Sequence, residues 1–312
     1  MGESESRFHF LEIGRVRRRP VAVPEEATAL VPRTRLRLAE TIGSFGSALG
    51  QFNTPAGLFI DGDGSVYVAD ARNNRVQKVT LEGDVYGMGG QGMLSLPQGV
   101  VVDNTGFIYI TELGGHRFRK FGPRGQFVFC LGGAGTLCRF SSPTALCMDA
   151  YHHLYICDTD NGRISSYSAT GHWRIDYHDP TDKGFRRPQG VAVDAEGRLW
   201  VADTLNHRIV RLLPDGLLDA VIGKPGPAPG ELSEPRGLAL DGDGGVWVAD
   251  SGNDRVQKFS ADGDLVCCFP ECPTPGLDLS SPSAVALDGQ GSIYVSDSMN
   301  HRLLRLAALG DD

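Results

Sequence analysis

The chain has 312 residues and a formal net charge of −8 at pH 7. This charge disfavours non-specific attraction to nucleic acid or to an anionic membrane surface, and no apolar run reaches the length of about 18 residues that a membrane helix needs. The sequence near Met1 lacks the apolar core of a secretory signal, and the number of cysteines, seven, is odd. We therefore expect a soluble cytoplasmic protein with reduced thiols and no membrane partner.

Residues 1–33 differ from the rest of the chain because they lack its repeat. Arg15 and the arginines at 17–19 are followed by Pro20, Pro24 and Pro32. Such a basic, proline-containing arm suits contact with an anionic partner; the alternative is an extension that packs on the rest of the protein. We favour the second interpretation, and we divide the chain into this arm and a repeat domain, 34–312.

The repeat domain contains six copies of one unit, spaced 42 to 47 residues apart. The copies begin at Pro55, Pro97, Pro143, Pro188, Pro235 and Pro282. Short apolar runs bounded by Gly, Asp and Asn predict three strands in each copy, for example 237–240, 246–249 and 255–259. A fourth strand, such as 217–222 or 265–269, precedes the next copy. This period, with four strands per unit, is typical of the blades of a β-propeller.

Two further columns repeat in register with the prolines. The residue twelve positions after each proline is aromatic: Tyr67, Tyr109, Tyr155, Trp200, Trp247 and Tyr294. The residue two positions later is small: Ala69, Thr111, Cys157, Ala202, Ala249 and Ser296. Large residues beside small ones allow twisted sheets to interdigitate face to face. The predicted fold is therefore an all-β, six-bladed β-propeller of four-stranded antiparallel blades.

The last copy lacks a fourth strand of its own, because its third strand ends near Leu306. Residues 35–42 resemble the fourth strands that lie between the other copies. We predict that this N-terminal strand completes the last blade and closes the ring, which removes two exposed sheet edges.

A carboxylate follows the second strand of every copy, and an arginine follows it five residues later. The pairs are Asp70 with Arg75, Glu112 with Arg117, Asp158 with Arg163, Asp203 with Arg208, Asp250 with Arg255, and Asp297 with Arg302. A ring of metal-binding carboxylates is one interpretation. We favour a structural one, in which each carboxylate caps a turn and pairs with its arginine.

Three histidines, His116, His207 and His301, fall in alternate copies and raise the alternative of a trigonal zinc site. They lie in turns away from the axis, however, and zinc requires bonds of about 2 Å. We therefore predict no metal and no cofactor.

The repeat resembles the NHL family. Each copy approximates P-x-G-V/L-x-V/L-D followed by W/Y-V-A/S-D-x-x-N-x-R, and the stretches LNHRIV (205–210) and MNHRLL (299–304) come closest to the motif. The resemblance covers about residues 35–306. It implies a six-bladed propeller, a fold that serves as a protein-binding module, as an RNA-binding module in some tripartite-motif proteins, and as an enzyme in a minority of relatives.

The loops that lead into the inner strands differ most between copies. Those entering copies 3 and 4 are basic with interleaved aromatics, whereas those entering copies 5 and 6 are acidic. Arginine and aromatic residues are enriched at protein interfaces, so we predict a non-catalytic module that binds a protein partner on this face. The candidate partner-binding residues are Gln98, Arg139, Phe140, Lys183, Phe185, Arg186, Arg187, Gln189 and Arg236.

Two other functions stay open. The basic sector with its aromatics also suits RNA, through phosphate contact and base stacking. A lyase or hydrolase would use the axial opening. The residues predicted there are Ala56, Gln98, Thr144, Gln189, Arg236 and Ser283, which include neither the histidines nor the set of carboxylate and amide ligands that related propeller enzymes use to hold a metal.

Overall fold

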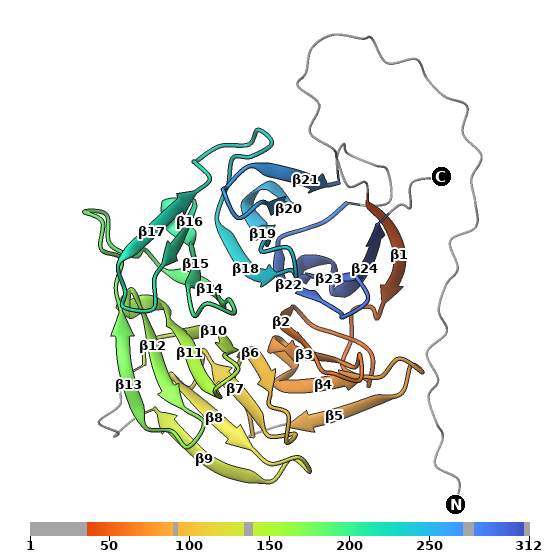
Figure 1. The fold of residues 1–312 in the computed structure, drawn as a ribbon. Coiled ribbons are helices and arrows are strands. Elements are labelled where there is room, and N and C mark those ends of the chain that lie inside the picture. The colour runs from red at the N-terminus through yellow and green to blue at the C-terminus, as the bar shows by residue number, and fades with distance from the viewer. Residues whose placement is uncertain (1–35, 90–92, 134–139, 271–277, 309–312) are drawn as a thin grey trace, which may run out of the picture.

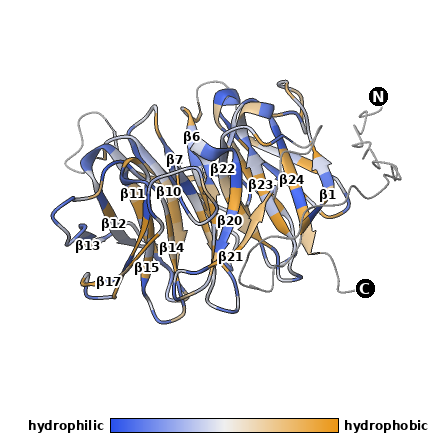
Figure 2. Cartoon of the chain, turned by 90° about the horizontal axis from the view of Figure 1, so that it is seen from above, coloured by the Kyte–Doolittle hydropathy of each residue, from blue (hydrophilic) through white to orange (hydrophobic). Residues whose placement is uncertain are grey.

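The computed structural model of the protein describes residues 36–89, 93–133, 140–270 and 278–308. They form six four-stranded antiparallel sheets, arranged as blades around a central axis (Figure 1). The predicted all-β, six-bladed propeller is thereby confirmed. Seen from the side, the strands of neighbouring blades stand next to one another and carry many of the apolar residues (Figure 2). No helix within the described segments has the length and apolarity to span a membrane.

Each blade runs outward from the axis in chain order. The inner strands are β2 (Pro55–Ile60), β6 (Pro97–Val102), β10 (Pro143–Met148), β14 (Pro188–Val193), β18 (Pro235–Leu240) and β22 (Pro282–Leu287). The second strands are β3 (Val66–Asp70), β7 (Ile108–Glu112), β11 (His153–Asp158), β15 (Leu199–Asp203), β19 (Val246–Asp250) and β23 (Ile293–Asp297). The third strands are β4 (Arg75–Val79), β8 (Arg117–Phe121), β12 (Arg163–Ser168), β16 (Arg208–Leu212), β20 (Arg255–Phe259) and β24 (Arg302–Ala308). The outer strands are β5 (Val85–Gly89), β9 (Phe127–Gly132), β13 (Trp173–Tyr177), β17 (Leu218–Ile222), β21 (Leu265–Phe269) and, in the last blade, β1 (Leu36–Ile42).

Strand β1 closes the ring, as the sequence predicts. It pairs antiparallel with β24, with Leu36 opposite Ala308 and Ile42 opposite Leu303. Leu36 and Leu38 pack against the apolar cluster between the fifth and sixth blades, and Ile42 is buried in the cluster between the sixth and first. The two ends of the propeller therefore share one sheet and leave no gap in the ring (Figure 1).

The aromatic residues twelve positions after each proline pack between blades, and several also donate a hydrogen bond to the turn between the inner and second strands. Trp200 is fully buried, and its indole Nε1 donates to Asp194 Oδ2 at 3.1 Å. Tyr109, Tyr155 and Trp247 make the equivalent hydrogen bond in their own blades. Tyrosine and tryptophan combine a large apolar body with one polar atom. In these four blades the hydrogen bond gives a reason for Tyr or Trp rather than Phe at this position.

The turns between inner and second strands lie on one face of the ring, which we call the hairpin face. In blade 4, burial alone would raise the pKa of Asp194, but hydrogen bonds from Trp200 and Arg198 outweigh it and lower the pKa. Blade 3 uses Asp149 in the same way, and His152, at φ +61°, takes the left-handed position that glycine occupies in other blades. Because residues 149–152 contain no glycine, this turn does not show the Asp and Gly that mark the equivalent turns of the other blades.

Candidate partner-binding face

The opposite face, which we call the crossover face, carries the loops into the inner strands and the turns between second and third strands. A buried carboxylate holds each of these loops. In blade 4, Asp203 Oδ1 accepts a hydrogen bond from the backbone N–H of Arg186 at 2.7 Å. Its Oδ2 accepts from Asn206 Nδ2 at 2.7 Å and from Arg208 Nε at 2.8 Å. These charge-assisted bonds fix the loop from beneath.

The other blades repeat this arrangement. The structure places Asp70 against Arg75, Glu112 against Arg117, Asp158 against Arg163, Asp250 against Arg255, and Asp297 against Arg302, at 2.7 to 2.8 Å. These five carboxylates and that of Asp203 are all inaccessible to solvent. In blade 4 the arginine has a second buried partner, because Arg208 also donates to Asp179 Oδ2 at 2.6 Å.

A second hydrogen bond, which was not predicted from the sequence, joins five of the six blades to the next. The residue nineteen positions after the repeated proline takes a left-handed conformation in all six blades. In five of them, all but blade 3, which has Gly162, its side chain accepts the backbone N–H of the residue before the next proline. His207 Nδ1, for example, accepts from Glu234 N at 3.0 Å. The same bond is made by Asn74, His116, Asp254 and His301. The signal was present in the sequence, since this column contains only Asn, His, Asp and one Gly.

This role accounts for the three histidines in alternate blades. Each uses Nδ1 as a hydrogen-bond acceptor for a separate loop, so in each the neutral ring carries its proton on Nε2. Within the described residues, no group of three or more His, Cys, Asp or Glu side chains is placed to hold a metal ion.

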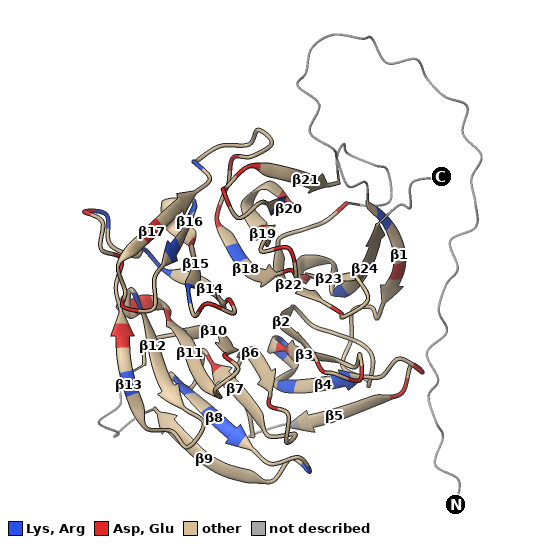
Figure 3. Ribbon diagram, viewed as in Figure 1, with Lys and Arg blue, Asp and Glu red and all other residues tan. Residues whose placement is uncertain are grey.

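Three predicted cations lie together in the loop that enters blade 4. Lys183, Arg186 and Arg187 are all exposed on the crossover face. Arg187 makes one exposed ion pair, with Asp160 at 3.4 Å. Figure 3 shows a basic residue on β18, and both basic and acidic residues around β14.

The prediction that Phe140 and Phe185 contribute to the binding surface is wrong. Phe140 is 6% exposed and Phe185 is 8% exposed, and both pack into the apolar clusters between blades. Their rings offer no surface to a ligand. The residue three positions before each proline is large and apolar in every copy, and it is always buried: Phe52, Leu94, Phe140, Phe185, Leu232 and Leu279. That column was available in the sequence. Arg139 lies outside the described residues.

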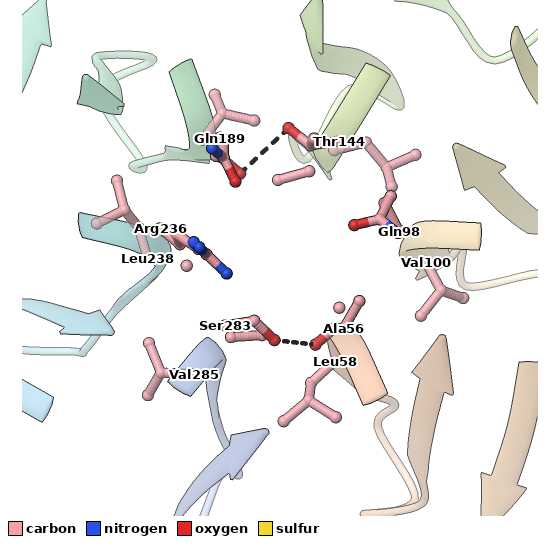
Figure 4. A pocket seen from close by; sticks show the side chains of 17 residues that line it. Ala56, Leu58, Gln98, Val100, Thr144, Gln189, Arg236, Leu238, Ser283 and Val285 are labelled. Carbon is pink, nitrogen blue, oxygen red and sulfur yellow. Dashed lines mark hydrogen bonds between the residues drawn. The ribbon is translucent and has the colours of Figure 1, made fainter. Parts of the chain in front are cut away.

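The remaining predicted residues surround the axis. Gln98, Gln189 and Arg236 line a cavity of about 100 Å³ at the crossover end of the axial opening, together with Thr144 and Ser283 (Figure 4). The Arg236 side chain points toward the axis. Burial lowers its pKa and Arg187 acts in the same direction, while Glu234 opposes them. A guanidinium nevertheless stays protonated at physiological pH.

Burial raises the pKa of the Cys147 and Cys157 thiols, neither of which lines this cavity, and so favours their protonated form. Among the described residues that line the crossover end of the axis, Arg236 is the ionisable one.

Comparison with solved structures gives matches to the whole ring at low sequence identity. A catalytically inactive virginiamycin B lyase from Staphylococcus aureus, solved with quinupristin, matches at 16% identity and a TM-score of 0.63, covering 88% of this chain and 99% of its own. A streptogramin B lyase matches at 17% identity and a TM-score of 0.62, covering 81% and 78%. A gluconolactonase from Xanthomonas campestris matches at 19% identity and a TM-score of 0.63, covering 84% and 88%. Likeness at this level of identity shows the fold alone.

Comparison with curated protein sequences finds no match. The sequence model of the NHL repeat matches residues 52–79, 185–212, 232–259 and 279–306. These four segments lie in blades 1, 4, 5 and 6, and each begins at the buried residue three positions before the proline and ends in the third strand. The chain therefore carries NHL repeats, recognised at four positions, in a six-bladed β-propeller.

Proposed function

We propose that this propeller is a protein-binding module and that its partner docks on the crossover face through Lys183, Arg186 and Arg187. The observation that carries the proposal is the form of this loop: three exposed cations stand on a backbone that is fixed by buried groups. The Arg186 N–H bonds to Asp203, and Arg208 reaches both Asp203 and the loop residue Asp179.

A fixed loop favours binding for an entropic reason. Ordering a free loop on association costs free energy, and a loop that is already held avoids most of this cost. The charges on the loop select a partner with an acidic surface segment, since complementary potentials raise the association rate and exclude like-charged competitors.

The same geometry favours protein over RNA. Single-stranded nucleic acid is bound by aromatic stacking as well as by positive charge. Phe140 and Phe185, the rings that would stack on bases, are buried between blades. The exposed cations that remain suit an acidic protein surface.

The test is charge reversal in the loop. Arg186→Glu combined with Arg187→Glu is expected to reduce partner capture about tenfold or more, because the change removes attraction and adds repulsion. Both side chains are exposed, so we expect the melting temperature to stay near that of the wild type. Capture is measured by affinity purification followed by quantification of the retained proteins.

The matched control makes the same change of charge elsewhere. Arg37 lies on β1 at the rim, and Arg124 lies in the turn between β8 and β9 on the hairpin face; both are exposed. Arg37→Glu with Arg124→Glu is expected to capture partners as the wild type does. Equal capture by the two double variants would remove the basic loop from the binding site.

A further inference from the structure

The axial opening contains one cation, Arg236, that differs from the six repeated arginines of the crossover face. The arginine that follows each second strand is bonded to a buried carboxylate. The Arg236 side chain makes no hydrogen bond to any described residue, and its Nε is buried without a partner. Its Nη2 makes one long ion pair, with Glu234 at 3.9 Å, which is beyond hydrogen-bond range, and the side chain as a whole is 31% exposed.

Leaving the buried Nε without an acceptor is unfavourable. A buried donor without an acceptor keeps its full desolvation penalty, and a charged donor more than a neutral one. An acceptor that enters the opening and pairs with the guanidinium would recover this free energy. The arrangement is therefore suited to binding an anion rather than to stabilising the fold.

Neighbouring side chains define the position of that anion. Blades 4 and 5 approach closely at this level, because a Cβ on Gly190 would lie 1.8 Å from the Arg236 carbonyl oxygen. Gln189, next to Gly190, therefore lies beside Arg236 at the opening (Figure 4). The two hydroxyls that line the opening are already used: Thr144 contacts Thr159, and Ser283 donates to the Ala56 carbonyl.

Size and charge select the ligand group. A cavity of about 100 Å³ admits a group of a few heavy atoms. One guanidinium with an adjacent amide matches a single negative charge, and the planar fork of arginine matches the two oxygens of a carboxylate. Arg187 adds positive potential nearby.

We propose that the axial opening is a carboxylate-binding site, in which the Arg236 guanidinium pairs with one carboxylate group and the Gln189 amide donates to it. The group belongs either to a small organic acid or to an Asp or Glu side chain of the protein partner. The second source rests on the proposed function; the first does not.

The experiment titrates protein labelled with ¹⁵N at arginine with acetate, and in parallel with acetamide, its neutral analogue. Acetate is expected to shift the Arg236 Nε–H resonance saturably, and acetamide is not. Arg236→Gln is expected to weaken acetate binding about tenfold to a hundredfold, which is the range for loss of a charge-assisted hydrogen bond. Arg186→Gln, on the same face but exposed, is the control and should bind acetate as the wild type does.

A second variant tests the site without removing the arginine. Gln189→Glu places a carboxylate next to Arg236 in a side chain of nearly the same shape, so the fold is retained and acetate is repelled. Equal shifts with acetate and acetamide, or unchanged acetate binding by either Arg236→Gln or Gln189→Glu, would overturn the proposal.

The source of the group is decided by competition. If acetate displaces a captured partner, the partner supplies the carboxylate; if acetate binds and the partner is retained, the ligand is a small acid. Both outcomes support the site. Failure of the site is distinct from failure of the proposed function, because the latter is measured by the reversal at Arg186 and Arg187.

Discussion

Deletion of residues 1–45 is expected to lower the free energy of unfolding by about 5 kcal/mol, whereas deletion of residues 1–30 is expected to change it little. The longer deletion removes β1, whose side chains Leu36, Leu38 and Ile42 are buried or half-buried between blades. Burial of each such side chain contributes about 1.5–3 kcal/mol when complete. A loss of this size approaches the whole stability of many domains.

The loss of stability should affect the whole propeller rather than one blade, because β1 joins the first and last blades. Without it, β24 becomes an outer edge with unpaired backbone groups, and such edges promote association between chains. Denaturant unfolding followed by circular dichroism, with light scattering to detect aggregation, measures both effects. Equal midpoints for the two truncations would show that β1 does not close the ring.

Arg208→Ala is expected to cost about 3–5 kcal/mol, the range found when one partner of a buried ion pair is removed. Arg208 is 5% exposed and contacts two carboxylates, those of Asp203 and Asp179, both inaccessible to solvent. Its loss leaves two buried negative charges without their main partner. It also releases the loop that enters blade 4.

The equivalent arginine of blade 6 gives the matched control. Arg302 is more exposed, and among the described residues its ion pair is with Asp297 alone; its other acceptor is the carbonyl of Asp278. Arg302→Ala is therefore expected to cost less, about 1–3 kcal/mol. Melting temperatures of the two variants, each compared with the wild type, measure this difference in cost. An effect of Arg208→Ala no larger than that of Arg302→Ala contradicts the importance we assign to the second carboxylate.

The fold was predictable because the sequence repeats a pattern of four strands with a period that is typical of propeller blades. Every copy begins at a proline and places an aromatic residue and a small residue in fixed register, so strand boundaries follow from comparison between copies. The closing strand was predictable by subtraction, since five copies have a following strand and the last does not. None of these inferences required knowledge of side-chain positions.

The site was harder to predict because it depends on which side chains are left over after packing. Phe185 stands in a basic loop and suggests a stacking surface, but it belongs to a column of buried residues that includes Phe52 and Leu232. Arg236 occupies the position that Gln189 has in the preceding blade, and the repeat shows it as the one charged residue of this column. That its Nε is buried without an acceptor arises from three-dimensional contacts and could not be predicted from the pattern of residues.

The central claim is that a protein partner binds the crossover face. Hydrogen exchange of the complex, compared with the free protein, measures this most directly. We predict slowed exchange of backbone amides in 181–187 and 233–237, with unchanged exchange in the hairpin-face turns 61–64, 194–197 and 241–244. Slowed exchange in those turns, with the loop entering blade 4 unaffected, would contradict the account.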